Sequence, residues 1–315
     1  MLFRSYSWGV PTFTASVVGG DSDSNKPFVS GTLTNLSNEA QEVYYSVTPK
    51  SGNCIGAAYS LTVYLNPTPV INAMSTVTCS GVMFNVTPTN GTNGIIPPGT
   101  KYTWTVPSYT GTVTGGDSMS VAQDGIFGTL INETSSVQTA TYTVRPTTLY
   151  CGTNNSFTVV VTVNPKPEIS AMSTVVCSGL MFDVTPVNST NGIVPVNTKY
   201  AWGIPSVSTA SLTGGASASG QNSVNGVLTN NTNTTRTAIY TVTPTATLGS
   251  CQGATFTVLV TVNPKAVISS MSTTVCSGVQ FNVTPVNGTN GIVPQGTDRK
   301  STRLNSSHVS ESRMP

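Results

Sequence analysis

The stretch FTVVVTVNPKPEISAMSTVVC, residues Phe157–Cys177, decides how this chain is organised. It alternates apolar and polar residues, breaks at an Asn-Pro step, alternates again and ends at a cysteine. Alternation of this kind is typical of strands, and an Asn-Pro step marks a turn between them. Closely similar stretches run from Tyr59 to Cys79 and from Phe256 to Cys276. We interpret each as the last strand of one unit, a joint, and the first strand of the next unit.

The repeat extends well beyond this stretch. The joint prolines Pro67, Pro165 and Pro264 are spaced 98 and 99 residues apart. Nearly the same spacing relates two sets of cysteines and two sets of aromatic residues: Cys79, Cys177 and Cys276; Cys54, Cys151 and Cys251; Trp8, Trp104 and Trp202; Tyr45, Tyr142 and Tyr240. A period near 100 residues matches one immunoglobulin-sized β-sandwich and is too long for a solenoid repeat of about 20 to 45 residues.

These landmarks divide the chain into four repeats and a tail. Residues 67–164 and 165–263 are complete and are named here the second and third repeats. Residues 1–66 correspond to the last two-thirds of a first repeat, and residues 264–297 to the first third of a fourth. We therefore expect an internal fragment of a longer array, with the start of the first repeat and the end of the fourth missing.

Composition favours an all-β chain with many loops. Charged residues make up 8%, against about 25% in a typical soluble domain. Thr and Val favour strands, whereas Asn, Gly and Pro favour turns. The net charge of +2 does not support binding to nucleic acid, and no apolar run is long enough for a membrane-spanning helix. The opening MLFRSYSWGVP lacks the apolar core of a signal peptide.

Alternation and Pro/Gly breaks predict short strands and no helix in the second repeat. We expect a turn at Gly115-Gly116-Asp117. The predicted strands are Pro67–Thr78, Val82–Thr87, Lys101–Val106, Gly128–Ile131, Ala140–Val144 and Phe157–Val163. About seven such strands fit a sandwich. The repeated tryptophans and tyrosines are interpreted as core residues, with a platform for stacking sugars as the alternative for tryptophan.

The joined motifs KYTWTVP, Thr114-Gly-Gly, GTLIN, TYTVRPT, Cys151, FTVVVTVNPKP, VVCSG and FDVTP are similar to those of the PKD-like repeats of bacterial surface proteins. The resemblance covers residues 1–297. It implies tandem PKD/immunoglobulin-like β-sandwiches in a long extracellular protein, often exported by type IX secretion. It also implies a role as spacer or adhesive stalk. Neither a signal peptide nor a C-terminal sorting domain is found in this sequence.

The register of the repeat ends at Asp298. The pattern predicts Lys-Tyr-x-Trp after Gly296-Thr297, but the chain reads DRKSTRLNSSHVSESRMP. This run resembles an adapter-derived sequence, so residues 298–315 are interpreted as an artefactual tail. A natural polar terminus is the alternative.

Two cysteines per repeat in a chain of low charge suggest disulfides and an oxidising compartment. We favour pairing within each complete repeat, which joins Cys79 to Cys151 and Cys177 to Cys251. Cys54 and Cys276 would then lack partners. The rival hypothesis pairs cysteines across each joint: Cys54–Cys79, Cys151–Cys177 and Cys251–Cys276. A third hypothesis is that some are buried free thiols.

Residues able to form a catalytic or metal site are scarce. The one histidine, His308, lies in the tail, and the 11 acidic residues do not recur in all copies. This pattern argues against Ser-His-Asp or Cys-His catalysis and against paired carboxylates. Asp21-Ser-Asp23-Ser-Asn25 has alternate oxygen ligands but lacks the remaining positions of a calcium loop. We predict no catalytic residue, no metal and no cofactor.

The sequence therefore predicts non-catalytic spacer or adhesive repeats of a large secreted or surface-anchored bacterial protein. Polysaccharide or protein ligands would bind through other parts of the parent protein. The alternative is that the sandwiches themselves bind carbohydrate or protein and are attached to a secreted enzyme.

Overall fold

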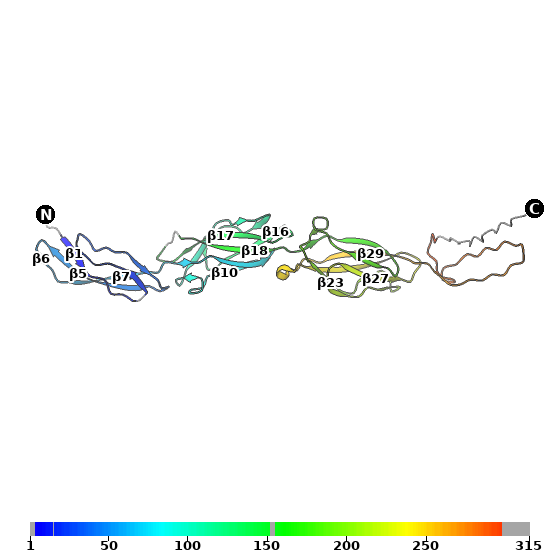
Figure 1. The fold of residues 1–315 in the computed structure, drawn as a ribbon, viewed down its shortest axis with the longest axis horizontal. Helices are drawn as coiled ribbons and strands as arrows, with labels where there is room; N and C mark the ends of the chain where they lie inside the picture. The colour runs from blue at the N-terminus through cyan, green and yellow to red at the C-terminus, as the bar shows by residue number, and fades with distance from the viewer. Residues whose placement is uncertain (1–3, 15, 152–154, 298–315) are drawn as a thin grey trace, which may run out of the picture. The chain divides into compact units, whose positions relative to one another are not determined.

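The computed structural model describes residues 4–14, 16–151 and 155–297, and it is built from β-strands (Figure 1). Its helical content within these residues is one short 3₁₀ turn, η1 (Leu248–Ser250). No helix in the described part of the chain is long and apolar enough to cross a membrane. The sequence prediction of an all-β chain of tandem sandwiches is confirmed.

The chain divides into two compact units that do not follow the repeat boundaries. The first unit holds the residues up to Glu168, together with Ile193–Thr198 and Thr245–Gly253. The second unit holds Ile169–Gly192, Lys199–Pro244 and the residues from Ala254 onward. The first unit thus contains the first and second repeats and the turn that leads to Cys251.

The second repeat, in the first unit, is a sandwich of a large and a small sheet. The large sheet has the order β15-β12-β17-β18-β9, with β13 also paired to β17. The small sheet has the order β10-β16-β14, and β8 pairs with β11. The strands are β8 (Val70–Ile71), β9 (Met74–Cys79), β10 (Met83–Val86), β11 (Gly94–Ile95), β12 (Lys101–Trp104), β13 (Ser108–Tyr109), β14 (Val113–Gly115), β15 (Met119–Gln123), β16 (Ile126–Asn132), β17 (Gln138–Thr147) and β18 (Phe157–Asn164).

The core lies between these two sheets. Phe84 and Leu130 come from the small sheet, whereas Tyr142 and Val161 come from the large one, and all belong to one buried cluster. The alternation of β17 places Ala140, Tyr142 and Val144 inward, because successive side chains of a strand point to opposite faces. Full burial of a valine side chain such as that of Val144 contributes roughly 1.5–3 kcal/mol of hydrophobic stabilisation.

The first and last strands of the second repeat run parallel. β9 lies along β18 with Met74 opposite Val159 and Cys79 opposite Asn164. A parallel pair needs a long crossover connection, and here the rest of the repeat supplies it. As a result, Cys79 lies at the end of the sheet where β18 finishes, beside the joint.

The predicted Gly-Gly turn follows β14 and requires both glycines. Gly115 and Gly116 have φ of 84° and 73°. A Cβ atom on Gly115 would lie 2.4 Å from the Thr129 carbonyl oxygen, and one on Gly116 would lie 2.5 Å from the Tyr142 hydroxyl. Both glycines therefore have a left-handed backbone conformation, and neither position has room for a Cβ atom.

A buried asparagine ties the small sheet to the last strand. Asn132 donates to the carbonyl oxygens of Ser136 at 2.7 Å and Val163 at 3.0 Å. Its side-chain oxygen accepts from the backbone N–H and hydroxyl of Thr134 at 2.9 and 2.7 Å. Asn35 and Asn230 make the equivalent bonds in the other repeats. These Asn-x-Ser/Thr sequences therefore have a structural role.

The third repeat reproduces this arrangement, largely within the second unit (Figure 1). Its large sheet has the order β20-β29-β28-β23-β26 with β24 on β28, its small sheet has the order β21-β27-β25, and β19 pairs with β22. The strands are β19 (Glu168–Ile169), β20 (Met172–Cys177), β21 (Met181–Val184), β22 (Gly192–Ile193), β23 (Lys199–Trp202), β24 (Ser206–Val207), β25 (Leu212–Gly214), β26 (Ala218–Gln221), β27 (Val224–Asn230), β28 (Arg236–Thr245) and β29 (Phe256–Asn263). β20 again runs parallel to the last strand, with Cys177 opposite Asn263.

The first repeat, in the first unit, has the same last strands but a smaller core. Its sheet has the order β3-β1-β5-β6 with β7 on β5, and β2 pairs with β4. Trp8, Val43 and Tyr45 form the centre of its core. The strands are β1 (Arg4–Trp8), β2 (Val17–Gly19), β3 (Asp23–Lys26), β4 (Leu33–Asn35), β5 (Gln41–Ser51), β6 (Cys54–Ile55) and β7 (Tyr59–Leu65).

Residues 264–297 form one small strand pair, β30 (Val267–Ile268) with β31 (Gly291–Ile292). No strand is assigned between these two in the described structure. Apolar side chains there stay exposed, with Phe281 at 64% and Val275 at 46%. The tail 298–315, including His308, lies outside the described residues.

Candidate functional site

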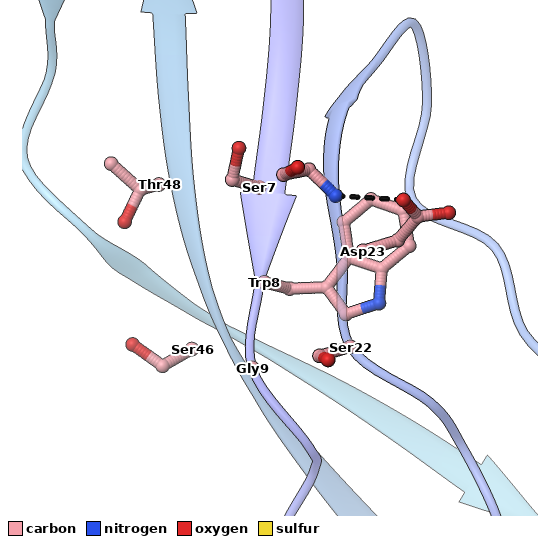
Figure 2. A pocket seen from close by; sticks show the side chains of 8 residues that line it. Ser7, Trp8, Gly9, Ser22, Asp23, Ser46 and Thr48 are labelled. Carbon is pink, nitrogen blue, oxygen red and sulfur yellow. Dashed lines mark hydrogen bonds between the residues drawn. The ribbon is translucent and has the colours of Figure 1, made fainter.

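The first repeat carries a groove across its larger sheet, with a cavity volume of about 610 Å³. Figure 2 shows Trp8 reaching from β1 toward Ser22 and Asp23, with Ser46 and Thr48 on the other side of β1. Hydroxyl groups dominate the lining, which consists of Ser7, Trp8, Gly9, Ser22, Asp23, Ser24, Ser46 and Thr48. The hydroxyl groups of the groove can therefore donate hydrogen bonds to a polar ligand and accept hydrogen bonds from it.

A bulge between β1 and β3 shapes one wall of this groove. Tyr6 lies opposite Lys26, but Trp8 lies opposite Asp23, so β3 has one residue more than β1 between these pairs. Asn25, within the bulge, has φ of 56°. A bulge of this kind re-aims neighbouring side chains and raises the local twist.

Asp23 is the acidic group of the groove, and its oxygens already have partners. The carboxylate accepts a hydrogen bond from the Ser24 N–H at 2.8 Å (Figure 2) and lies 3.3 Å from the Lys26 ammonium. Both ion-pair partners are about half exposed, so the pair contributes little to stability. The described residues contain no cluster of three or more His, Cys, Asp or Glu that could hold a metal ion. Within the Asp21–Asn25 run, the residues from Asp23 onward belong to strand β3.

The second repeat has a groove at the equivalent place, with a volume of about 840 Å³. Met119 stands where the first repeat has Asp23, and Arg145 stands where it has Thr48. The lining is Thr103, Trp104, Thr105, Val106, Ser118, Met119, Ser120, Thr143 and Arg145. The groove thus recurs, but its charge changes from acidic to basic, and no single ligand chemistry is shared by the two copies.

The repeated tryptophans lie in the cores. Trp8, Trp104 and Trp202 are 5%, 4% and 6% exposed. Their indole N–H groups donate to the carbonyl oxygens of Asp21, Asp117 and Ala216 at 3.0, 3.1 and 3.1 Å. A stacking platform for sugars needs an exposed ring face, which these side chains do not offer.

The repeated tyrosines are buried beside the Gly-Gly turns. Tyr45, Tyr142 and Tyr240 are at most 3% exposed, and their hydroxyl groups have no hydrogen-bond partner. Burial raises the pKa of Tyr240 to about 12, and burial likewise raises the pKa of Tyr142. Such neutral phenols serve packing and are not placed to transfer protons.

The predicted disulfides are wrong. The structure joins Cys79 to Cys251, with a Cα–Cα distance of 5.6 Å. Neither Cys79–Cys151 nor Cys177–Cys251 is present, and none of the three pairs across the joints is present either. Cys54, Cys177 and Cys276 are exposed free thiols, and Cys151 is a partly buried one.

The parallel first strand explains this correction. Cys79 lies opposite Asn164, at the end of β18, whereas Cys151 precedes Phe157, where β18 begins. Seven residue steps of strand span roughly 23 Å. A disulfide needs Cα atoms within about 7 Å, so the first and last cysteines of one repeat are at opposite ends of its sheet.

The turn before Cys251 brings this residue to Cys79, and both belong to the first unit. Gly249 in that turn has φ of 70°, and its carbonyl oxygen lies 3.7 Å from the Cys79 sulfur. Sequence spacing contains no signal for this pairing, because the partners are 172 residues apart and belong to different repeats.

Comparison with known proteins identifies the family to which the repeats belong. The profile of the PKD-like domain matches residues 3–69, 75–167 and 173–266. The chain belongs to the PKD-like domain family. These three matches cover most of the sequence and follow the repeats that the cysteines, tryptophans and joint prolines mark. The curated proteins include no match to this chain.

Solved structures similar to this PKD-like chain include cadherin domains, a desmocollin ectodomain and a bacteriophage capsid protein. Cadherin domains 1–4 of protocadherin gamma B7 align with 87% of this chain and 71% of their own, at 10% identity and a TM-score of 0.27. The human desmocollin-1 ectodomain aligns at 10% identity and a TM-score of 0.23, and the chain covers 57% of it. Three N-terminal domains of the bacteriophage RB49 Hoc capsid protein align over 84% of this chain and 88% of their own, at 11% identity and a TM-score of 0.32. Similarity at such low sequence identity and TM-score does not indicate a function.

Proposed function

We propose that this PKD-like chain is a non-catalytic spacer or adhesive array. In this proposal it holds a binding or catalytic unit away from the surface of a secreted or surface-anchored bacterial protein. The modules would be residues 1–66, 67–164, 165–263 and 264–297. The observation that carries the proposal is the recurrence of separately packed cores, while the grooves of the first and second repeats share no polar site among the described residues. The cores of the second and third repeats correspond position for position, whereas the groove changes from Asp23 to Met119 and from Thr48 to Arg145 between the first and second repeats.

The Cys79–Cys251 disulfide supports an oxidising compartment outside the cytoplasm. It also supports a mechanical role, because it ties the second repeat to the third by a covalent bond. A tethered array that is pulled at its ends would transmit force through this bond instead of through the intervening backbone.

Single-molecule pulling of the full chain tests this function. In reducing buffer, each complete repeat of about 98 residues should release roughly 330 Å of chain in one step. In oxidising buffer, the residues between Cys79 and Cys251 should remain locked. Extension without discrete steps in both buffers would contradict the spacer function.

A second function, binding of polysaccharide, is favoured by one observation, the hydroxyl-lined groove of the first repeat. A glycan array probed with the full chain tests it. Binding that is lost on Ser7→Leu, and retained in the matched surface control Ser75→Leu on β9, would establish the groove as a ligand site. Absence of binding to the array would leave the spacer function.

A further inference from the structure

The groove of the second repeat contains a cation without a partner. Arg145, on β17, is the only charged residue among the nine that line this groove. Its side chain is exposed, and within the described structure its guanidinium makes no hydrogen bond or ion pair. A guanidinium has five N–H donors and is not deprotonated in proteins. The groove therefore presents a permanent positive charge whose donors are available to a ligand.

The other basic residue of the second repeat is already neutralised. Lys101 and Arg145 are the only lysine and arginine between residues 67 and 164. On β12, Lys101 and Thr103 alternate with buried aromatic residues, so their side chains share the outer face of the large sheet with Arg145. The Lys101 ammonium forms an ion pair with the Asp124 carboxylate. The acidic residues of this repeat are absent from the lining of the groove: Asp117, Asp124 and Glu133.

Hydroxyl groups surround the charge of Arg145. Five of the nine lining residues are serine or threonine. Thr103 lies directly opposite Arg145 in the ladder between β12 and β17, and Thr143 precedes Arg145 by two residues on the same face of β17. Side chains in these two relations have Cβ atoms about 5 Å and roughly 7 Å apart. A ligand that contacts the guanidinium can therefore reach two hydroxyl groups at the same time.

Apolar side chains also line this groove. Val106 is 61% exposed, and Met119 is partly buried against the core. A sugar ring combines hydroxyl groups at its edge with apolar C–H groups on its faces. Ligand sites commonly combine apolar surface with a few placed polar groups. The lining therefore matches a sugar ring more closely than it matches a small inorganic anion.

A wider bulge distinguishes this groove from the equivalent places in the other repeats. Three residues of β15, Ser120–Ala122, lie between those that pair with Trp104 and Tyr102. The bulges in β3 and β26 contain two residues at this point. Bulges re-aim side chains and are over-represented next to active sites. The groove is correspondingly larger, with a volume of about 840 Å³ against about 610 Å³ in the first repeat.

We propose that the groove of the second repeat binds an anionic polysaccharide. The Arg145 guanidinium holds an acidic group of the sugar by two parallel hydrogen bonds, the geometry typical of arginine with planar oxyanions. Thr103 and Thr143 bind hydroxyl groups of the same ring, and Met119 contacts its apolar face. This site goes beyond the spacer function, and it is independent of the groove of the first repeat, which has Thr48 in place of the arginine.

An acidic peptide is the competing anionic ligand, and the position of the groove disfavours it. An extended peptide binds a sheet by adding to an exposed strand edge, where main-chain hydrogen bonds supply the affinity. β12 and β17 are interior strands of the large sheet, with β15 and β18 along their outer edges. Arg145, Thr103 and Thr143 therefore lie on a face whose main-chain groups are already paired.

Calorimetric titration of the full chain with defined polymers tests this proposal. Polygalacturonate and dextran sulfate supply the acidic group as carboxylate and as sulfate, and the tighter of the two identifies the group that Arg145 prefers. Polygalacturonate whose carboxyl groups are reduced to alcohols is the neutral control, and polyglutamate is the peptide control. We expect binding to at least one acidic polysaccharide, and binding weaker by roughly tenfold or more to both controls.

Three variants assign the binding to the groove. Arg145→Thr, which introduces the residue type of Thr48, should weaken binding by roughly tenfold, because a hydrogen-bonded charge pair is lost. Thr143→Val removes one hydroxyl group at nearly constant shape and should weaken it severalfold. Lys166→Thr is the matched control, since it removes an exposed positive charge outside the groove, and the affinity should stay within about twofold.

The proposal has clear contrary outcomes. Absence of binding to both acidic polysaccharides would overturn it, as would equal binding to polyglutamate or to the reduced polymer. Equal losses in Arg145→Thr and Lys166→Thr would overturn it too, because they would indicate attraction by net charge. None of these outcomes bears on the spacer function, since a chain that binds no polysaccharide can still unfold in discrete steps under force.

Discussion

The first and second repeats carry the same aromatic landmarks, yet their cores differ. Tyr45 and Tyr142 occupy equivalent places, and Trp8 and Trp104 make the same hydrogen bond to a turn carbonyl. The second repeat, however, fully buries the inward-facing valines of its last strand, β18, and β9 pairs along the edge of that strand. The first repeat has no counterpart of β9 among its described residues. The comparison shows that the landmarks specify the fold locally, whereas strands distant in sequence complete the core.

The largest difference between the two repeats should come from the disulfide, which ties the second repeat and not the first. The double variant Cys79→Ser/Cys251→Ser should lose about 4 kcal/mol of unfolding free energy for the disulfide-linked repeats, because a long loop is no longer closed in the unfolded state. Urea unfolding followed by tryptophan fluorescence measures this. Cys54→Ser is the control and should be neutral. An unchanged midpoint in the double variant would show that the bond does not form in solution.

The Gly-Gly turn should be the next most sensitive point. Gly116→Ala should destabilise the second repeat by roughly 3 kcal/mol, since it combines a left-handed backbone with overpacking against the Tyr142 hydroxyl and Leu130. Gly20→Ala, the matched change in the first repeat, meets Tyr45 and the half-buried Leu33 and should cost less. Thermal unfolding of the two variants compares them. Equal losses would mean that the first repeat is as tightly packed as the second.

A smaller effect should distinguish the two last strands. Val161→Ala removes two methyl groups from a site with no exposed surface and should cost about 2 kcal/mol. Val63→Ala, at the half-buried equivalent in β7, should cost less than about 1 kcal/mol. Denaturant unfolding provides both values.

The smallest effect near neutral pH should come from the buried tyrosines. Burial raises the pKa of Tyr102, Tyr200 and Tyr240 to about 12. The unfolded chain therefore releases these protons first, so stability should be constant below about pH 10 and decline as pH rises from about 10 toward 12. Chemical denaturation at pH 8, 10 and 11, with tyrosine ionisation followed by absorbance, checks the direction. A midpoint that did not fall by pH 11 would contradict this assignment.

Several features of the fold could be predicted from local pattern. The predicted strand Lys101–Val106 contains β12, and Phe157–Val163 nearly coincides with β18. The prediction ended the strand Ala140–Val144 before Pro146, but β17 continues to Thr147. The pairing of β17 with β18 ends at Val144. Pro146 lies beyond this pairing, so its lack of an N–H removes no hydrogen bond between β17 and β18.

Other features could not be predicted, because they depend on contacts across the sandwich. The strands β11, β13 and β14 are two or three residues long and carry little periodicity. Asn132 is a core residue only because the Val163 carbonyl and the turn at Ser136 meet at its amide. The groove at Trp8 likewise arises from a bulge between β1 and β3, which leaves no mark in the sequence.

The sequence by itself determined the period, the all-β class and the repeated aromatic residues. These properties follow from alternation and from Pro and Gly punctuation, which act within a few residues. The tertiary structure alone decided which cysteines meet. The reason is the parallel pairing of β9 with β18, which places the first cysteine of a repeat beside the joint that follows it and away from the last cysteine of the same repeat. The stretch Phe157–Cys177 encodes both strands of such a joint, but not the partner of its cysteine.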